Sequence, residues 1–164
     1  MKKLLCTLAA ALTMGSAFAW PDKPVTLVVP FPPGGSTDLI ARTLIPKLQD
    51  KLGGTFIVDN KAGASGMIAA QHVAKAAPDG YTLSLAPTGQ LTVLPHLNKK
   101  IPYDPFRDFA PVSIVASVPY VLAASAATPA NSVKDLIAAA KKAPGTLSYS
   151  SCGNGTLCHL SGEL

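Results

Sequence analysis

The chain has 164 residues and a formal net charge of +5, from fourteen Lys and Arg against nine Asp and Glu. This length is enough for a domain with a core of its own. The basic residues are scattered along the chain, whereas a nucleic-acid-binding protein would carry a basic stripe with interleaved aromatic residues. The composition thus predicts no nucleic-acid partner, and the modest positive surplus is compatible with a small anionic ligand.

Residues 1–19 have the pattern of a secretory signal peptide. Two lysines follow Met1, residues 4–12 form an apolar core, and a small-x-small cleavage site ends at Ala19. The apolar run is short for a membrane span and no second one follows, although an uncleaved anchor is the alternative. We therefore expect export, cleavage between Ala19 and Trp20, and no membrane insertion afterwards.

Residues 25–38 join an apolar, β-branched run to the start of a helix through prolines and a glycine pair. Such a turn leaves N–H groups unpaired at the positive end of the helix dipole, and glycine lets an anion approach the backbone closely. The segment predicts a site for a carboxylate, with a purely structural turn as the alternative. We expect Ser36 to cap the helix. Asp38 is expected to contact ligand, to be stabilised by the dipole, or both.

Two further strand–loop–helix units follow the first. Helix 36–52 should be bent or interrupted at Pro46, and glycines then lead into a strand at 55–58. A helix at 67–76 and a strand at 81–85 complete the pattern, which is typical of a parallel sheet covered by helices. The loops after parallel strands meet at one sheet edge, where ligands bind. All three carry glycine with Ser or Thr, at 34–36, 63–66 and 88–89.

The second half of the chain contains one more strand–loop–helix unit with a glycine-rich loop. Two β-prone runs separated by Pro119 are expected to be strands at 112–118 and 120–124. A helix is expected at 133–143, capped by Ser132 with Asp135 in a capping-box arrangement. A short strand at 146–150 then enters the glycine-rich segment 151–156, after which a helix starts.

Two cysteines, Cys152 and Cys158, flank this last glycine-rich segment. In an oxidising compartment they can form a disulfide, but spacing alone does not say whether their Cα atoms are close enough. Two unpaired thiols are the alternative. A metal site with the adjacent His159 would lack a fourth ligand, so we expect no metal.

Together these segments make the chain similar to the substrate-binding receptors of tripartite tricarboxylate transporters, the Bug family. The order and spacing of the motifs carry the resemblance, which spans residues 20–164. The motifs are Trp20-Pro-Asp-Lys-Pro-Val25, Val29-Pro-Phe-Pro-Pro-Gly-Gly-Ser-Thr-Asp38, Asn60-Lys-Ala-Gly-Ala-Ser-Gly66, Ala77-Pro-Asp-Gly-Tyr-Thr-Leu83, Ile101-Pro-Tyr-Asp-Pro105, Asp108-Phe-Ala-Pro-Val112 and Tyr149-Ser-Ser-Cys-Gly-Asn-Gly-Thr156.

The resemblance implies a periplasmic α/β protein of the type II periplasmic-binding-protein fold, with two lobes facing each other across a cleft. The first lobe would span residues 20–118, and a crossover and incomplete second lobe residues 119–164. Family members bind small carboxylates (di- and tricarboxylates, amino acids or aromatic acids) largely through main-chain groups, and deliver them to a membrane permease without a cofactor. Carried over by position, the ligand-binding residues would be Phe31, Gly34, Gly35, Ser36, Asp38, Ala64, Ser65, Gly66, Thr88, Gly89, Ser151, Gly153, Asn154, Gly155, Thr156 and His159.

Two departures from the family pattern are expected to matter. Family members continue well past the equivalent of Leu164, so the sequence resembles a C-terminally truncated receptor, whose cleft would be incomplete. Cys152 and Cys158 stand where serine or another polar residue is expected, and Cys152 would lie against a loop that binds the ligand. A disulfide between them would alter that loop.

Other functional classes fit the sequence less well. Residues 63–66 are not a nucleophile elbow because Met67 takes the place of the last glycine, and residues 34–36 are not a P-loop because the lysine is missing. We therefore expect no enzyme and no catalytic residues. A ligand-presenting receptor for a membrane sensor and a non-functional fragment are the remaining alternatives.

Overall fold

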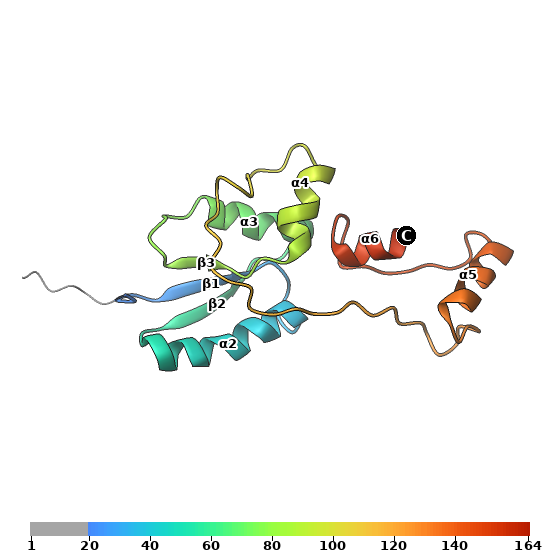
Figure 1. The fold of residues 1–164 in the computed structure, drawn as a ribbon, viewed down its shortest axis with the longest axis horizontal. Helices are drawn as coiled ribbons and strands as arrows, with labels where there is room; N and C mark the ends of the chain where they lie inside the picture. Colours follow the sequence, from blue (N-terminus) through green and yellow to red (C-terminus); the bar gives the residue numbers. More distant parts are fainter. Residues whose placement is uncertain (1–19) are drawn as a thin grey trace, which may run out of the picture.

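A parallel β-sheet forms the body of the protein. The computed structural model describes residues 20–164, so the predicted signal peptide at 1–19 lies outside the described residues. The sheet contains β1 (Val25–Val29), β2 (Phe56–Asn60) and β3 (Thr82–Ser84), in the order β2-β1-β3 (Figure 1). Parallel neighbours require a crossover between consecutive strands, and helices supply it. The predicted α/β architecture is therefore confirmed.

Helices cover both faces of this sheet. Helix α2 (Ser36–Leu52) packs against β1 and β2, and α3 (Met67–Ala74) packs on the opposite face against β1 and β3 (Figure 1). Leu27, Val29 and Ala41 form the buried centre of the α2 side, with partly buried hydrophobic neighbours around them. Because β1 lies in the middle with a helix on either side, nearly its whole length is buried, as its unbroken run of apolar residues requires.

Three loops leave the carboxyl ends of the strands at one edge. The loop after β2 contains a short 3₁₀ turn, η1 (Ala64–Gly66), and the loop after β3 leads into η2 (Gly89–Val93), a π-helical turn continued by α4 (Leu94–Leu97). The sequence pattern of residues 90–97 had not predicted a helix. Pro95 does not oppose this helix, because it stands in the first turn of α4, where its missing N–H costs little.

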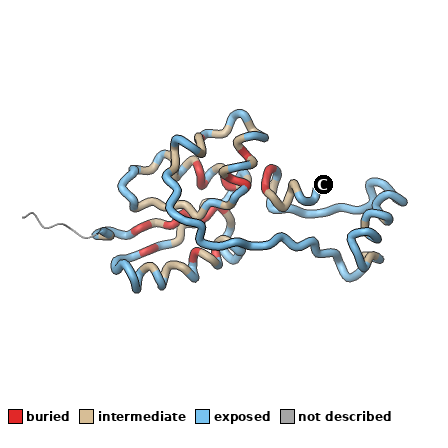
Figure 2. Tube along the Cα trace, viewed as in Figure 1, coloured by how far each residue is buried: buried red, intermediate tan, exposed pale blue. Residues whose placement is uncertain are grey.

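The strands predicted beyond residue 110 are not formed. Residues 112–118, 120–124 and 146–150 run as extended, exposed chain without ladder hydrogen bonds (Figure 2). Their β-branched and apolar side chains suit a strand, but a strand also needs a neighbour to pair its N–H and C=O groups. Within residues 20–164 the chain carries these runs away from the sheet, so those three predictions were wrong.

Two helices were predicted correctly in this half of the chain. Helix α5 (Val133–Lys142) ends one residue before the predicted boundary, and Ser132 caps it by accepting a hydrogen bond from the Asp135 N–H at 3.1 Å. Helix α6 (Leu157–Glu163) starts directly after the glycine-rich segment and lies beside α4 (Figure 1). The proposed lobe boundary at residue 118 stays a prediction.

Candidate functional site

Asp38 fixes the loop between β1 and α2. This loop comprises residues 30–35, and we call it the ligand loop. The Asp38 carboxylate accepts hydrogen bonds from the Gly34 N–H, from Arg42 Nε and from Asn60 Nδ2, each at 2.9 Å. The same Asn60 amide group also donates to the Phe31 carbonyl at 3.0 Å. The start and the middle of the loop are therefore fixed to α2 and β2 through side chains.

Asp38 is a buried anion, with 3% of its surface exposed. Hydrogen bonds from the Arg42 guanidinium, the Gly34 N–H and the Asn60 amide hold the pKa of its carboxyl far below the usual range, because all three favour the charged form. Asp38 does not line the neighbouring cavity, since its carboxylate is directed to these three donors. This geometry favours the structural role predicted for Asp38 over ligand contact.

The N-terminus of α2 opens onto the cavity. Gly35 is the N-cap residue and makes no side-chain cap bond, so the expectation that Ser36 would cap the helix was wrong. Ser36 is instead the first helical residue, and its side chain is exposed. The first-turn N–H groups of a helix have no partner inside the helix, and Ser36 and Thr37 of this turn line the cavity.

The loop after β2 has an unusual backbone. From Gly63 to Gly66, four successive residues have positive φ, including the two non-glycine residues Ala64 and Ser65 at φ 48° and 55°. L-residues are disfavoured there, and such clusters are characteristic of functional sites. The Ser65 hydroxyl donates to the Asn154 carbonyl at 2.8 Å, so this loop contacts the glycine-rich segment 151–156 directly.

The loop after β3 is fixed by Gln90. This side chain is 3% exposed, and its Nε2 donates to the Gly66 carbonyl at 2.6 Å, which joins the second and third loops. On its other side, the Tyr103 hydroxyl donates to the Gln90 carbonyl at 2.5 Å. Gln90 thus links two of the loops predicted to share a sheet edge, and sequence reasoning missed it.

The fourth segment, 151–156, closes over the third loop. A Cβ added to Gly89 would lie 3.4 Å from the Leu157 nitrogen and from the Thr156 Cα, so only a small residue fits between the two backbones. Thr156 is the N-cap of α6 and accepts a hydrogen bond from the His159 N–H at 3.3 Å. Its hydroxyl donates to the Gly153 carbonyl at 2.6 Å, which holds the segment in a tight turn.

The two cysteines form a disulfide in this structure. The Cα atoms of Cys152 and Cys158 are 6.2 Å apart, within the range a disulfide spans, and both residues face the cavity. The alternative left open by the sequence is therefore decided in favour of the bond. It ties the segment 151–156 to the first turn of α6.

These four segments surround a cavity of about 440 Å³ whose lining residues include no charged side chain and no histidine. Of the predicted site residues, six line it: Phe31, Gly35, Ser36, Ser65, Gly89 and Thr156. Ten do not line it: Gly34, Asp38, Ala64, Gly66, Thr88, Ser151, Gly153, Asn154, Gly155 and His159. The structure places eight further residues in the wall: Pro32, Thr37, Pro87, Gln90, Tyr120, Cys152, Leu157 and Cys158.

Several of the residues outside the lining still hold the loops. Gly34 and Gly66 take positive φ, and the Asn154 carbonyl receives the Ser65 hydroxyl. The His159 ring stacks on Tyr149 at a centroid distance of 6.3 Å. Of the missed residues, Thr37 and Gln90 adjoin predicted ones, whereas Tyr120 is remote and no local sequence signal marks it.

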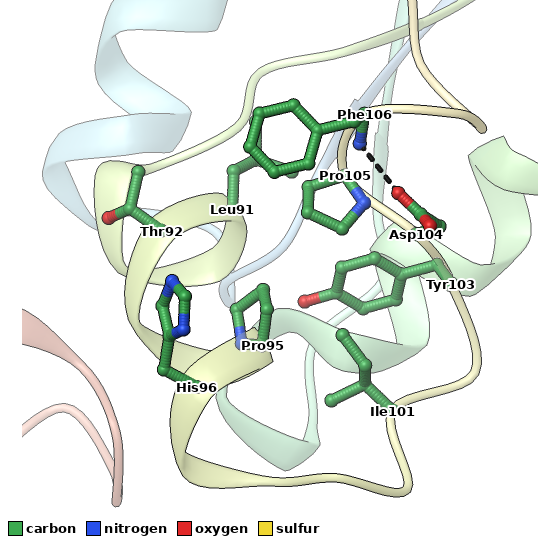
Figure 3. A pocket seen from close by; sticks show the side chains of 9 residues that line it. All are labelled: Leu91, Thr92, Pro95, His96, Ile101, Tyr103, Asp104, Pro105 and Phe106. Carbon is green, nitrogen blue, oxygen red and sulfur yellow. Dashed lines mark hydrogen bonds between the residues drawn. The ribbon is translucent and has the colours of Figure 1, made fainter.

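A second, shallower groove of about 350 Å³ lies on the other side of η2 and α4. It is mainly apolar, and the Tyr103 and Pro95 rings line it while Phe106, 94% exposed, stands at its rim (Figure 3). Asp104 in this groove accepts the Phe106 N–H of its own loop at 2.9 Å. This groove is lined by residues between 91 and 106 alone, whereas the three strand-end loops and segment 151–156 meet at the first cavity, so the first is the candidate ligand site.

Two features are absent from residues 20–164. No three His, Cys, Asp or Glu side chains come together in a way that would hold a metal ion. Among the described helices, none has the length and apolar character needed to cross a membrane.

Comparison with known families identifies the chain. A family model described as "Tripartite tricarboxylate transporter family receptor" matches residues 40–164. The chain belongs to this receptor family. The resemblance inferred from the sequence motifs is therefore confirmed, and so is the prediction of a receptor in place of an enzyme.

Relatives of the receptor include protein BugT from Bordetella pertussis (strain Tohama I), which is 43% identical over 150 residues. That match covers 91% of this chain and 46% of BugT. A protein from Pseudomonas sp. (strain P51), encoded in the tcbD-tcbE intergenic region, is 40% identical and covers 99% of this chain and 50% of its own length. The receptor chain thus spans about half the length of these relatives.

Solved structures confirm the fold. The periplasmic binding protein BugD matches with a TM-score of 0.76 at 36% identity, over 87% of this chain and 48% of BugD. R. palustris Rpa4515 with adipate has a TM-score of 0.78 at 41% identity, over 88% and 48% of the two chains. MatC from Rhodopseudomonas palustris with bound malate has a TM-score of 0.56 at 41% identity, over 58% and 33%. The chain therefore shares the predicted periplasmic-binding-protein fold over the part of these proteins that it spans, about half of each.

Proposed function

We propose that the receptor captures a small organic carboxylate in the cavity between the ligand loop and the segment 151–156. Two related structures contain such ligands, adipate in one and malate in the other. The bound carboxylate would be presented to the membrane permease of a tripartite transporter in the periplasm. The family description, the pattern of residues 1–19 and the periplasmic relatives support this compartment and this partner.

The observation that carries this proposal is the kind of donor that the cavity offers. Its wall contains residues of the N-terminal turn of α2, of the other two loops and of α6, yet no Lys, Arg or His. Main-chain N–H groups at a helix N-terminus stabilise an anion without a counter-charged side chain. Such a site recognises a carboxylate group, while the apolar and hydroxyl groups of the rest of the wall contact the remainder of the ligand.

Within the site, we assign the carboxylate to the N–H groups of Gly35, Ser36 and Thr37. Gly89, Thr156 and Ser65 line the same cavity and would contact the rest of the ligand. Gly34 and Asp38 act through the shape of the ligand loop and not by contact. The sixteen ligand-binding residues predicted from the sequence thus form two groups, those that would contact the ligand and those that shape the loops around it.

Thermal unfolding with added carboxylates tests this function. We expect adipate, malate or citrate to raise the melting temperature, because a ligand at a hundred times its dissociation constant adds about 2.7 kcal/mol to the free energy of unfolding. The diamide of adipic acid has the same length without charge and should give no shift. Phe106→Ser, in the second groove, is the matched control variant and should respond like the wild type. A cooperative transition that no carboxylate moves would contradict the proposal.

A further inference from the structure

The ligand loop is built on a buried negative charge, although we propose that it binds an anion. The Asp38 carboxylate accepts a hydrogen bond from the Gly34 N–H at 2.9 Å, and Gly34 directly precedes Gly35, the N-cap of α2. This carboxylate and a bound ligand would both lie at the positive end of the same helix. Like charges at one site destabilise each other, so an uncompensated Asp38 would weaken the binding of a carboxylate.

Arg42 supplies the compensating charge. Its Nε donates to the same Asp38 oxygen that accepts the Gly34 N–H, at 2.9 Å, and its Nη2 donates to Asn60 Oδ1 at 3.3 Å. The Arg42 side chain is 54% exposed and stands one helical turn after Asp38. Asn60 donates to the other Asp38 oxygen, so the carboxylate is neutralised and directed away from the cavity.

We infer that Asp38 is a positioning residue for the ligand loop and that Arg42 is its counter-charge, which allows a loop fixed by a carboxylate to bind a carboxylate. The effect of Arg42 on ligand binding rests on the proposed function, whereas the positioning of the loop by Asp38 does not. Asp38 takes the Gly34 N–H, which leaves the following N–H groups free for the ligand. Arg42 removes the electrostatic cost of that arrangement.

Calorimetric titration with adipate or malate tests the role of Arg42. We expect Arg42→Gln to weaken binding by roughly five- to tenfold at low salt, the size of a unit charge acting over several ångströms near a surface. The loss should shrink at high salt, because ions screen the exposed charge. Lys47→Gln removes one positive charge from an exposed position on the same helix and should leave the affinity within about twofold.

The double variant Asp38→Asn with Arg42→Gln separates charge from structure. Without the carboxylate there is nothing to neutralise, so the affinity should return toward the wild-type value and lose its excess salt dependence. Arg42→Lys keeps the charge but cannot reproduce both contacts of the guanidinium, so it should recover most, though not all, of the affinity lost in Arg42→Gln. An Arg42→Gln protein that binds like the Lys47→Gln control, or a double variant as weak as Arg42→Gln alone, would overturn the counter-charge role.

Hydrogen exchange of the Gly34 amide tests the positioning role without any ligand. This amide should be protected in the wild type and in Arg42→Gln, and should exchange faster by about tenfold or more in Asp38→Ala, which removes its acceptor. Equal exchange in all three proteins would overturn the assignment of Asp38. If the wild type binds no carboxylate but the Gly34 amide behaves as expected, the proposed function fails while the positioning of the loop stands.

Discussion

At the scale of single residues, the two adjacent glycines of the ligand loop have different roles. Gly34 has φ 89°, a left-handed conformation that other residues adopt at a cost, and a Cβ there would meet no atom within 4 Å. Gly35 has φ −76° and caps α2. The requirement for glycine is therefore conformational at Gly34 and absent at Gly35, a difference that the sequence Gly-Gly does not reveal.

Serine substitutions at these two positions should separate the two roles. Gly34→Ser should lower the free energy of unfolding by about 1 kcal/mol, because serine is strained at positive φ. Gly35→Ser should leave stability unchanged or slightly higher, since serine is a favourable N-cap residue. Urea unfolding of both variants beside the wild type measures the difference, and equal losses at the two positions would contradict this interpretation.

At the scale of elements, α2 shows how packing overrides a local breaker. Pro46 was expected to bend or interrupt the helix, yet α2 runs from Ser36 to Leu52 as one element. The missing N–H of Pro46 costs one helix hydrogen bond. Ala41 is buried on the sheet and Ile45 packs beside it, so the apolar face holds the helix across the proline.

Helix α5 is the opposite case, because no part of it is fully buried. Its start depends on Ser132, whose hydroxyl also donates to the Asp135 carboxylate at 2.8 Å. We expect Ser132→Ala to destabilise α5 locally by about 1 kcal/mol, the usual cost of a lost N-cap. The melting temperature of the whole protein should stay unchanged.

Amide hydrogen exchange resolved along the sequence measures this effect. Faster exchange confined to residues 133–142 is the expected result. Ser113→Ala, at an exposed serine that caps no helix, is the matched control. A general loss of protection that includes the sheet would show that α5 stabilises the core, contrary to its exposure.

At the scale of the whole molecule, buried residues are concentrated in one half of the chain. Among residues 20–164, the buried hydrophobic residues all lie between Val25 and Tyr103, whereas residues 110–127 are exposed throughout (Figure 2). The exposed half contacts the body through segment 151–156 and α6, where a Cβ on Gly155 would lie 2.5 Å from the Leu94 side chain. The cavity therefore depends on a contact between a rigid body and a weakly packed extension.

Exchange across the whole chain should follow this division. Amides of β1 and of the central turns of α2 should be the most protected, and those of residues 112–124 should exchange at nearly unprotected rates. Mass-spectrometric exchange at two protein concentrations provides the test. Protection of residues 112–124 that rises with concentration would show that this charge-free, apolar run pairs with a second copy and is not free in solution.

The sequence by itself determined the alternation of strands and helices from β1 to β3, the parallel sheet and the family. Each of these follows from local pattern: an apolar run predicts β1, helical periodicity predicts α2, and the glycine-containing turns between them predict where the loops lie. The N-termini of two helices were predicted from local signals. Helix α2 starts at Ser36 with its N-cap one residue earlier than predicted, and Ser132 is the N-cap of α5 as predicted.

Only the tertiary structure decided where side chains and unpaired segments end up. Asp38 was predicted near the ligand, but its direction depends on Arg42 one turn later and on Asn60 from another strand. The strands expected at 112–124 needed partners that residues 20–164 do not provide, and the Cys152–Cys158 bond needed two Cα atoms 6.2 Å apart. Contacts between distant residues carry no local sequence pattern, so these features follow from the fold alone.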